Sequence, residues 1–513
     1  MTEILGRITE NIWTVYYIRQ VLSVLVLFVI GLLVLSLSDG TEFKKDENTG
    51  RHISIEYKFL LAFPVGMALF SVCALVLLIC NVKYMVFSII LVVSAVIITL
   101  IILSEKMGFV VNEFRDNRWK CIIYTGVVLT LILIAVSGIV SIGYSNDSMY
   151  YYSAYPHELV LRGDIYEGFD VFLTDCGQTT AIINTIPFMF GFNETFGIHT
   201  FFNFNLICFF AYAVYEKCSM YFDRKISTVT TLLSTLFLVT ATPYMFVSKW
   251  IIANMYFMGY SFILLHLNNR FVNDESTIYV KSLLFIMLSF VRIEGALYAG
   301  LIMLVYMMQE NIKKNNVIMM VMPAAVIQAF YYIKIFVFMH IKAIYTFMTW
   351  QKAIVAVAFL IAIIVYALFV SEDTKHPVIM ERFAFVSPIY ITFSGLIVVN
   401  AGLLVYDRGI FISNVKVFIG NVVKNSGWGF FAAVIVVMIL LVPKTKIKTL
   451  YYEYFCGGFI LVSFAACFAR GDGLRVNLFD SSNRVMLQIV PFIVYALVNR
   501  YIETYATFEK NNT

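Results

Sequence analysis

The sequence predicts an all-α polytopic membrane protein with about 13–14 membrane helices. The chain has 513 residues, of which 61% are hydrophobic and only 13% are charged. That composition leaves too little polar surface to cover a soluble domain of this size. Apolar runs of roughly 20 residues, the length that spans a bilayer as a helix, recur from one end of the chain to the other.

Each apolar run predicts one membrane helix, and the first run lacks a small-residue cleavage site, so we expect it to be retained. Of the eight cysteines, only Cys176 lies in the longest polar interval, and no CxxC spacing occurs. Cysteine therefore predicts neither a disulfide framework nor a metal site. The runs lie near residues 18–38, 59–80, 84–104, 121–142, 200–216, 227–247, 251–267, 282–308, 317–338, 353–370, 384–405, 427–443, 450–468 and 484–499.

The longest polar interval, residues 143–200, is rich in aromatic residues and in carboxylates. Loops of this length are usually functional or disordered. Its Tyr, Phe and Ile residues can bury surface, which argues against disorder. We therefore predict a folded loop that lies against the membrane. The interval holds one Arg, Arg162, and no Lys. Its acidic residues are Asp147, Glu158, Asp164, Glu167, Asp170, Asp175 and Glu194.

The distribution of Lys and Arg among the loops predicts how the chain is oriented, because cytoplasmic loops carry an excess of basic residues. Loops 39–58, 104–120 and 217–226 are basic, whereas the 143–200 loop holds one Arg. Near the C-terminus, the basic segment 444–448 and the tail fall on one side, and the loop 469–484 falls on the other. These patterns place both 143–200 and 469–484 on the outer face.

The orientation estimated from the N-terminal loops agrees with that estimated from the C-terminal segments on one condition. The run 282–308 must not cross the membrane as one helix. Arg292, Glu294 and Gly295 interrupt this run at its centre. Because charges at membrane depth are costly, they normally face protein or a water-filled cavity. We therefore predict a broken hairpin with these residues at its tip, near the outer face. The same count puts the N-terminus outside, unless residues 1–17 form an amphipathic interfacial helix.

Three groups of residues are candidates for chemistry. Asp147 follows the fourth apolar run at the membrane surface, where a carboxylate can act as a general base on a hydroxyl; the alternative is a solvated loop acid. Asn483 and Arg484 lie at the start of the last run. An Arg there is suited to binding a phosphate; the alternative is an Arg that anchors the helix at the membrane interface. Arg292 and Glu294 suit either a functional site or a structural ion pair.

In this order along the chain, these residues resemble the GT-C superfamily of polyprenyl-phosphate-sugar-dependent glycosyltransferases. An outward loop after an early helix carries the key Asp in that family, near a Tyr-rich stretch followed by Gly-Asp. Here the matching residues are Asp147, Tyr150–Tyr152 and Gly163-Asp164. The segments 292–295 and 480–491 are similar to the family's broken short helix and to its late Asn-Arg segment.

The resemblance implies a membrane enzyme that moves a sugar from a polyprenyl-phosphate donor to a lipid or cell-envelope glycan, with inversion. It implies that Asp147 is the general base. It also implies a multi-pass location in the plasma membrane. Basic residues beside membrane helices explain the net charge of +5, so we expect no nucleic-acid partner. The family admits a divalent metal cofactor. Many relatives have two adjacent acids where this chain has Asp147-Ser148, and this departure argues against a metal-dependent mechanism. The residues expected to bind substrate are Asp164, Asp175, Arg292, Glu294, Asn483 and Arg484.

The resemblance also suggests how the chain is divided. Residues 1–120 form N-terminal membrane helices without an assigned role, 121–499 form the GT-C-like catalytic module, and 500–513 form a cytoplasmic tail. Two alternatives remain: a flippase or other transporter for lipid-linked sugars, and a polysaccharide polymerase or ligase. A transporter would favour internal repeats and ionisable residues near the membrane midplane.

Overall fold

The protein is an all-α polytopic membrane protein, as the sequence predicts. Six described helices are long and apolar enough to cross a membrane: Tyr17–Ser36, Ile55–Ile79, Arg118–Val136, Gly197–Ser219, Lys314–Phe338 and Trp350–Phe369. The computed structural model describes residues 12–39, 53–80, 82, 114–137, 150–162, 178–189, 196–241, 244, 245, 248, 250, 252–309, 312–344, 348–369, 388–409, 411–413, 415, 416, 434, 437, 451–469 and 487–512.

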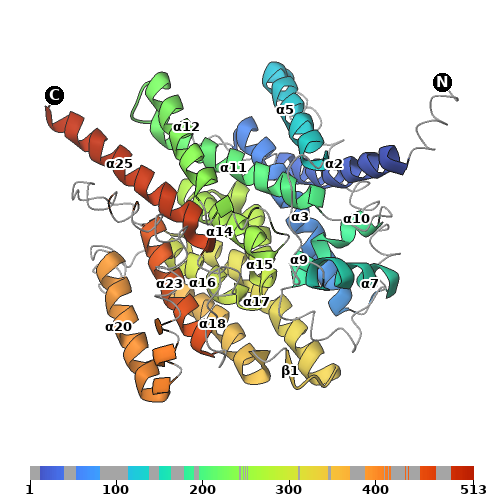
Figure 1. The fold of residues 1–513 in the computed structure, drawn as a ribbon, viewed down its shortest axis with the longest axis vertical. Helices are drawn as coiled ribbons and strands as arrows, with labels where there is room; N and C mark the ends of the chain where they lie inside the picture. Colours follow the sequence, from blue (N-terminus) through green and yellow to red (C-terminus); the bar gives the residue numbers. More distant parts are fainter. Residues whose placement is uncertain are drawn as a thin grey trace.

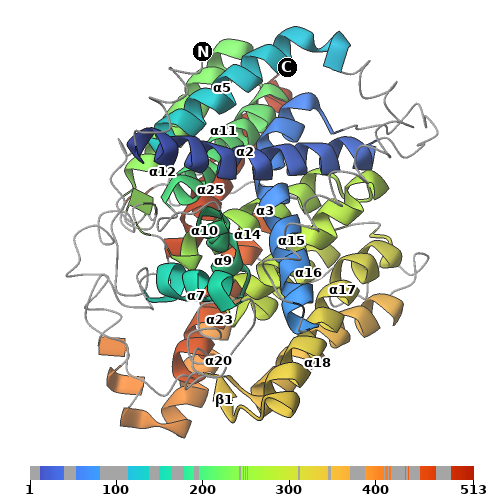
Figure 2. The ribbon, with the colours of Figure 1, turned by 90° about the vertical axis from the view of Figure 1, so that its right-hand side faces the viewer.

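The N-terminal helices α2 (Ile12–Asp39) and α3 (Ile55–Ile79) cross in direct backbone contact. A Cβ atom on Gly31 would lie 1.7 Å from the carbonyl oxygen of Ala62, and one on Gly66 would lie 1.8 Å from that of Leu27. Ala62 and Gly66 are four residues apart, the small-xxx-small spacing that lets membrane helices approach closely. Figure 2 shows α2 lying across α3. Helix α5 (Arg118–Val136) packs beside this pair.

The run 282–308 forms two short helices, α15 (Ile278–Val291) and α16 (Gly295–Met307). At 1.5 Å per residue each is about 20 Å long, shorter than the roughly 30 Å hydrocarbon core. The helices are antiparallel, because Lys281 at the start of α15 lies 5.9 Å from the ring centre of Tyr306 at the end of α16. The predicted broken hairpin, with its turn at residues 292–294, is confirmed.

Several long helices surround the hairpin. Helix α14 (Ala253–Arg270) contacts both of its arms, and α17 (Lys314–Ile333) packs along α15. Helices α11 (Phe196–Ser219), α23 (Tyr451–Ala469) and α25 (Val490–Asn512) complete the core. Tyr298 of α16 stacks on Phe459 of α23, with ring centres 4.7 Å apart. Helices α12 (Arg224–Thr240) and α20 (Pro388–Tyr406) lie at the periphery (Figure 1).

After α17 the chain forms a π-helical turn, η4 (Lys334–Phe338), and a short pair of antiparallel strands, β1 (Ala343–Ile344) and β2 (Met348–Thr349). Helix α18 (Trp350–Phe369) then returns beside α17 (Figures 1 and 2). Two 3₁₀ turns, η3 (Glu275–Thr277) and η5 (Leu487–Ile489), precede α15 and α25.

The hairpin defines two ends of the helix bundle. We call the end that carries residues 292–294 the tip end, and the end where α15 starts and α16 stops the base end. Helix α17 starts at the base end, where the Lys313 amide donates to Asn273 at 3.2 Å. It finishes at the tip end, where Lys334 donates to the carbonyls of Leu78 and Ile79 and so caps α3.

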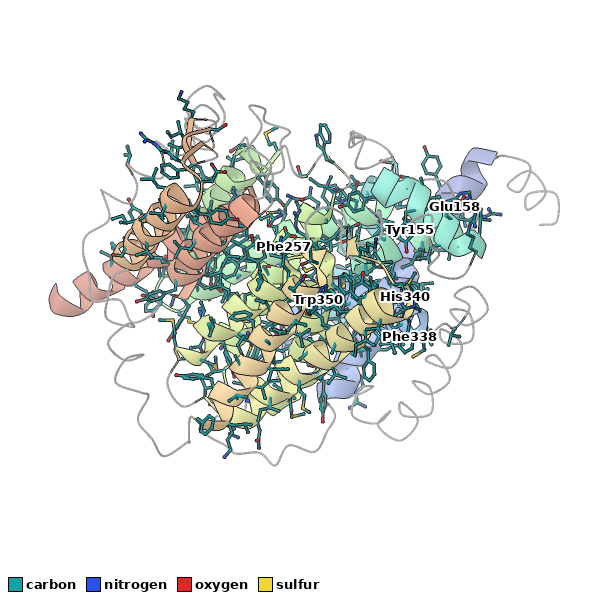
Figure 3. The ribbon with its side chains drawn as sticks, turned by 90° about the horizontal axis from the view of Figure 1, so that it is seen from below. Tyr155, Glu158, Phe257, Phe338, His340 and Trp350 are labelled. Atoms are coloured by element: carbon teal, nitrogen blue, oxygen red, sulfur yellow. The ribbon has the colours of Figure 1, made fainter. Side chains whose placement is uncertain are left out.

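Part of the 143–200 interval folds into short helices, as predicted for this loop. They are η1 (Tyr150–Ala154), α7 (Tyr155–Arg162), α9 (Gln178–Ile183) and α10 (Thr185–Met189). Every residue from 178 to 188 is buried. Helices α7, α9 and α10 gather beside α3 in both side views (Figures 1 and 2). In the view from below, Tyr155 and Glu158 of α7 lie in the same half of the molecule as Phe338 and His340 (Figure 3).

Candidate functional site

Two of the residues predicted to form the site, Arg292 and Glu294, are described by the structure, and they lie together at the hairpin tip. Arg292 Nε donates to Glu294 Oε1 at 2.6 Å. The side chains are 17% and 9% exposed, so this is a largely buried ion pair. The predicted residues Asp147, Asp164, Asp175, Asn483 and Arg484 lie outside the described residues.

The surroundings of Arg292 keep it charged. Its Nη1 atom donates to Oδ1 of Asn254 in the first turn of α14, at 2.8 Å. Burial alone would lower the pKa of Arg292, but the Glu294 carboxylate beside it raises the pKa above its ordinary value. Tyr152 of η1 and Tyr298 of α16 lie within electrostatic range of the guanidinium. The tip therefore carries a permanent positive charge, neutralised on one side by Glu294.

Local sequence explains why the turn forms here. Arg292 has an extended backbone that ends α15, and Gly295 starts α16 three residues later. A Cβ atom at Gly295 would lie 2.4 Å from the carbonyl oxygen of Leu288, so only glycine permits so close a reversal of the chain. The charged pair thus projects from a turn whose geometry depends on one glycine.

The folded part of the 143–200 loop is fastened to this hairpin. The last carbonyls of a helix have no partner within the helix. Thr180 of α9 donates to one of these, the carbonyl of Val291, at 3.1 Å. Thr179 donates to the carbonyl of Met287, one turn earlier in α15, at 3.3 Å. With Tyr152 near Arg292, two separate segments of the loop reach the tip. The structure therefore brings the loop and the Arg292–Glu294 pair to one end of the bundle.

Asn254 belongs to this cluster although the sequence analysis did not single it out. It lies in the first turn of the helix formed by the apolar run 251–267, and it is 4% exposed. A polar residue at that position is typical of a helix start. The signal available in the sequence was therefore no stronger than that of an ordinary helix terminus.

A second polar cluster occupies the base end. Glu216 of α11 accepts hydrogen bonds from Tyr57 of α3 at 2.7 Å and from Arg270 of α14 at 2.9 Å. Tyr57 also contacts Nε2 of His266 at 2.8 Å, and Nδ1 of His266 contacts Tyr452 of α23 at 3.1 Å. This cluster, which the sequence analysis did not predict, links four helices through side-chain hydrogen bonds.

The base cluster has a defined hydrogen-bond direction. An ionised carboxylate only accepts hydrogen bonds, so the Tyr57 hydroxyl donates its single hydrogen to Glu216. The Tyr57 oxygen must then accept from Nε2 of His266, which carries the proton on that nitrogen. In neutral His266, Nδ1 accepts from the Tyr452 hydroxyl. The base cluster is thus an ordered chain that joins helix ends.

Within the described ranges, no group of three or more His, Cys, Asp or Glu side chains could hold a metal ion. No protein-family model, no curated protein and no solved structure matches the chain. The tip cluster offers a charged guanidinium, a carboxylate and an amide, with the phenols of Tyr152 and Tyr298 in electrostatic range.

Proposed function

We propose that the protein is a GT-C-like glycosyltransferase that acts at the tip end of the bundle. Its donor is a sugar on a polyprenyl phosphate, and its acceptor is a hydroxyl of a lipid or cell-envelope glycan. One observation carries the proposal: the folded helices of the 143–200 loop pack against the hairpin tip that bears Arg292. The loop predicted to hold the general base and an arginine suited to phosphate thus share one end of the bundle.

The proposed reaction assigns a role to each group. Asp147 removes the proton from the acceptor hydroxyl as that oxygen attacks the anomeric carbon. The bond from that carbon to the phosphate oxygen breaks, and configuration inverts. Arg292 and Arg484 stabilise the charge that grows on the departing phosphate, a preorganised electrostatic role. Asp164, Asp175, Glu294 and Asn483 bind and orient substrate. A divalent metal stays open.

Charge at the two ends supports an outward-facing tip. Described basic residues at the base end outnumber those at the tip end, and cytoplasmic loops are the basic ones. The tip end, whose described basic residues include Arg162, Arg292, Lys334, Lys342 and Lys352, then faces outward across a plasma membrane. The basic residues at the base end include Lys120, Lys217, Arg224, Lys225, Arg270, Lys281, Lys313, Lys314 and Arg500.

The distribution of buried charge favours a transferase over a transporter. A transporter would need ionisable groups near the midplane of several helices. In the described part of the chain, every buried charged residue and histidine lies near a helix end, at the tip or at the base. These residues are Lys58, His199, His266, Lys281, Glu294 and Lys334.

The decisive experiment compares lipid extracts of a deletion strain, its parent and strains complemented with wild type or Asp147→Asn. Mass spectrometry should show that an unused polyprenyl-phosphate sugar accumulates in the deletion strain, together with loss of one glycosylated lipid or envelope glycan. Wild type should reverse both changes, and Asp147→Asn should reverse neither. Identical lipid and glycan profiles in deletion strain and parent would contradict the proposed function.

A further inference from the structure

Asn254 has an unused hydrogen-bond donor beside Arg292. Its Oδ1 atom accepts from Arg292 Nη1 at 2.8 Å. Because arginine only donates, this contact fixes the amide with its oxygen toward the guanidinium and its nitrogen directed elsewhere. The nitrogen, Nδ2, is buried and has no hydrogen-bond partner in the structure. A buried donor without a partner is costly, so the position calls for an acceptor.

Beside Asn254, Arg292 has N–H groups that make no hydrogen bond within the described residues. A guanidinium carries five N–H groups, and its hydrogen bonds within the described residues are those to Glu294 and Asn254. Glu294 holds Nε, and Asn254 holds Nη1, so the orientation of the planar fork is fixed before a ligand arrives. Two donor groups from different helices, α14 and the hairpin turn, are thus preorganised next to each other.

We propose that Arg292 and Asn254 form an oxyanion-binding subsite for a phosphate group, and that Asn254 both positions Arg292 and donates to the ligand through Nδ2. A phosphate presents several acceptor oxygens and a negative charge, which match an amide N–H beside a guanidinium. The subsite rests on the proposed function only for the source of the phosphate, the lipid donor. Its chemistry would suit a free phosphate as well.

The test is a binding measurement on purified full-length protein in nanodiscs, with a polyprenyl phosphate as the probe. Wild type should bind it, and Asn254→Asp should weaken binding by about tenfold or more, the size of one charge-assisted hydrogen bond. Asn268 of α14 is also buried but lies toward the base end, so Asn268→Asp should leave affinity unchanged. Asn254→Ser, which keeps a small neutral donor, should retain more affinity than Asn254→Ala.

Charge and hydrogen bonding are separated by the double variant Asn254→Asp/Glu294→Gln. It restores the net charge of the cluster but lacks the amide donor at position 254. The subsite predicts that affinity stays low. Full recovery would mean that only net charge matters and would overturn the donor role of Asn254, as would wild-type affinity in a correctly folded Asn254→Asp protein.

Two further arms identify the phosphate source. Competition by inorganic phosphate, with the same sensitivity to Asn254→Asp, would support the subsite and assign it to free phosphate. Binding of neutral polyprenol as tightly as of polyprenyl phosphate would overturn it. Because binding is measured without turnover, Asn254-dependent phosphate binding in a protein that transfers no sugar would reject the proposed function and keep the subsite.

Discussion

The tip cluster and the base cluster both contain an arginine–carboxylate pair, but they differ in what the pair connects. At the base, Glu216 and Arg270 belong to different helices, and Tyr57 and His266 extend the hydrogen bonds to α3 and α23. At the tip, Arg292 and Glu294 are two residues apart in one turn, and Asn254 is the partner from another helix. The base pair joins two helices, whereas both charges of the tip pair come from one turn.

This difference indicates different uses for similar chemistry. Hydrogen bonds between separate helices, such as those of Glu216, help to hold those helices together. A pair confined to a three-residue turn contributes little to holding helices together, so its charge is available to a ligand. We therefore expect base variants to change stability and tip variants to change function. The following predictions test that division, beginning with the largest effect.

The largest effect is expected for Asp147, in the loop assigned to the tip end. If Asp147 is the general base, Asp147→Asn should lower turnover by about 10²–10⁴-fold, the usual contribution of general base catalysis. Expression and membrane insertion should be unchanged, because the sequence predicts this carboxylate at the membrane surface, where it is not needed for folding. Glycosyl transfer by reconstituted protein is the measurement. Near-normal turnover in Asp147→Asn would contradict a general base at the tip end. Asp164→Asn and Asp175→Asn should lower turnover less than Asp147→Asn does.

The second prediction compares the two arginines directly. Removing Arg292 removes a charge-assisted interaction worth roughly 1.5–3 kcal/mol, so Arg292→Ala should lower turnover by about 10–100-fold. Arg292→Lys should keep part of the activity, since lysine offers charge without the planar fork. Because Arg292→Ala leaves Glu294 unpaired, Arg292→Ala/Glu294→Ala controls for folding. Arg270→Ala, the matched base variant, should mainly lower thermal stability; equal losses of turnover in both would break the comparison.

The third prediction concerns Glu216, which accepts hydrogen bonds from both α3 and α14. Removing one partner of a buried pair costs about 3–5 kcal/mol, and partial exposure of this pair reduces the expected cost to about 2–3 kcal/mol. Glu216→Ala should therefore lower the apparent Tm in detergent by several degrees. Arg292→Ala/Glu294→Ala at the tip, which removes both charges and leaves neither unpaired, should lower it less. The comparison fails if this double variant is more destabilising than Glu216→Ala.

The sequence alone predicted the helical membrane fold and the broken hairpin. Both follow from local signals: apolar runs of membrane length, and the interruption of the run 282–308 at its centre by Arg292 and Glu294. It did not predict the base cluster, because Tyr57 and His266 are 209 residues apart in the sequence. Tyr57 lies just before the apolar run 59–80, and His266 lies within the run 251–267, and neither position carries a local signal of a contact. Nor did it predict Asn254 as the partner of Arg292. Contacts between distant segments depend on helix packing, which hydropathy and charge patterns do not encode.

The smallest expected effect concerns the attachment of the loop to the hairpin. Thr180 donates to the carbonyl of Val291, the last residue of α15, across 111 residues of sequence. Thr180→Val keeps the shape of the side chain but leaves that buried carbonyl without its donor. The expected cost is about 1 kcal/mol, that of one neutral hydrogen bond.

Hydrogen exchange should detect this change where thermal unfolding would not. In Thr180→Val, amides of residues 178–189 and of the hairpin turn should exchange roughly fivefold faster, the equivalent of about 1 kcal/mol, because local opening becomes easier. Base-end amides around His266 should be unaffected.

Thr235 is the control: its hydroxyl is buried without a hydrogen-bond partner in the structure, so Thr235→Val should change exchange nowhere. Unchanged exchange at residues 178–189 would mean that the loop stays on the tip without this bond. Faster exchange at both ends would mean that the tip and base are one cooperative unit, which the comparison does not predict.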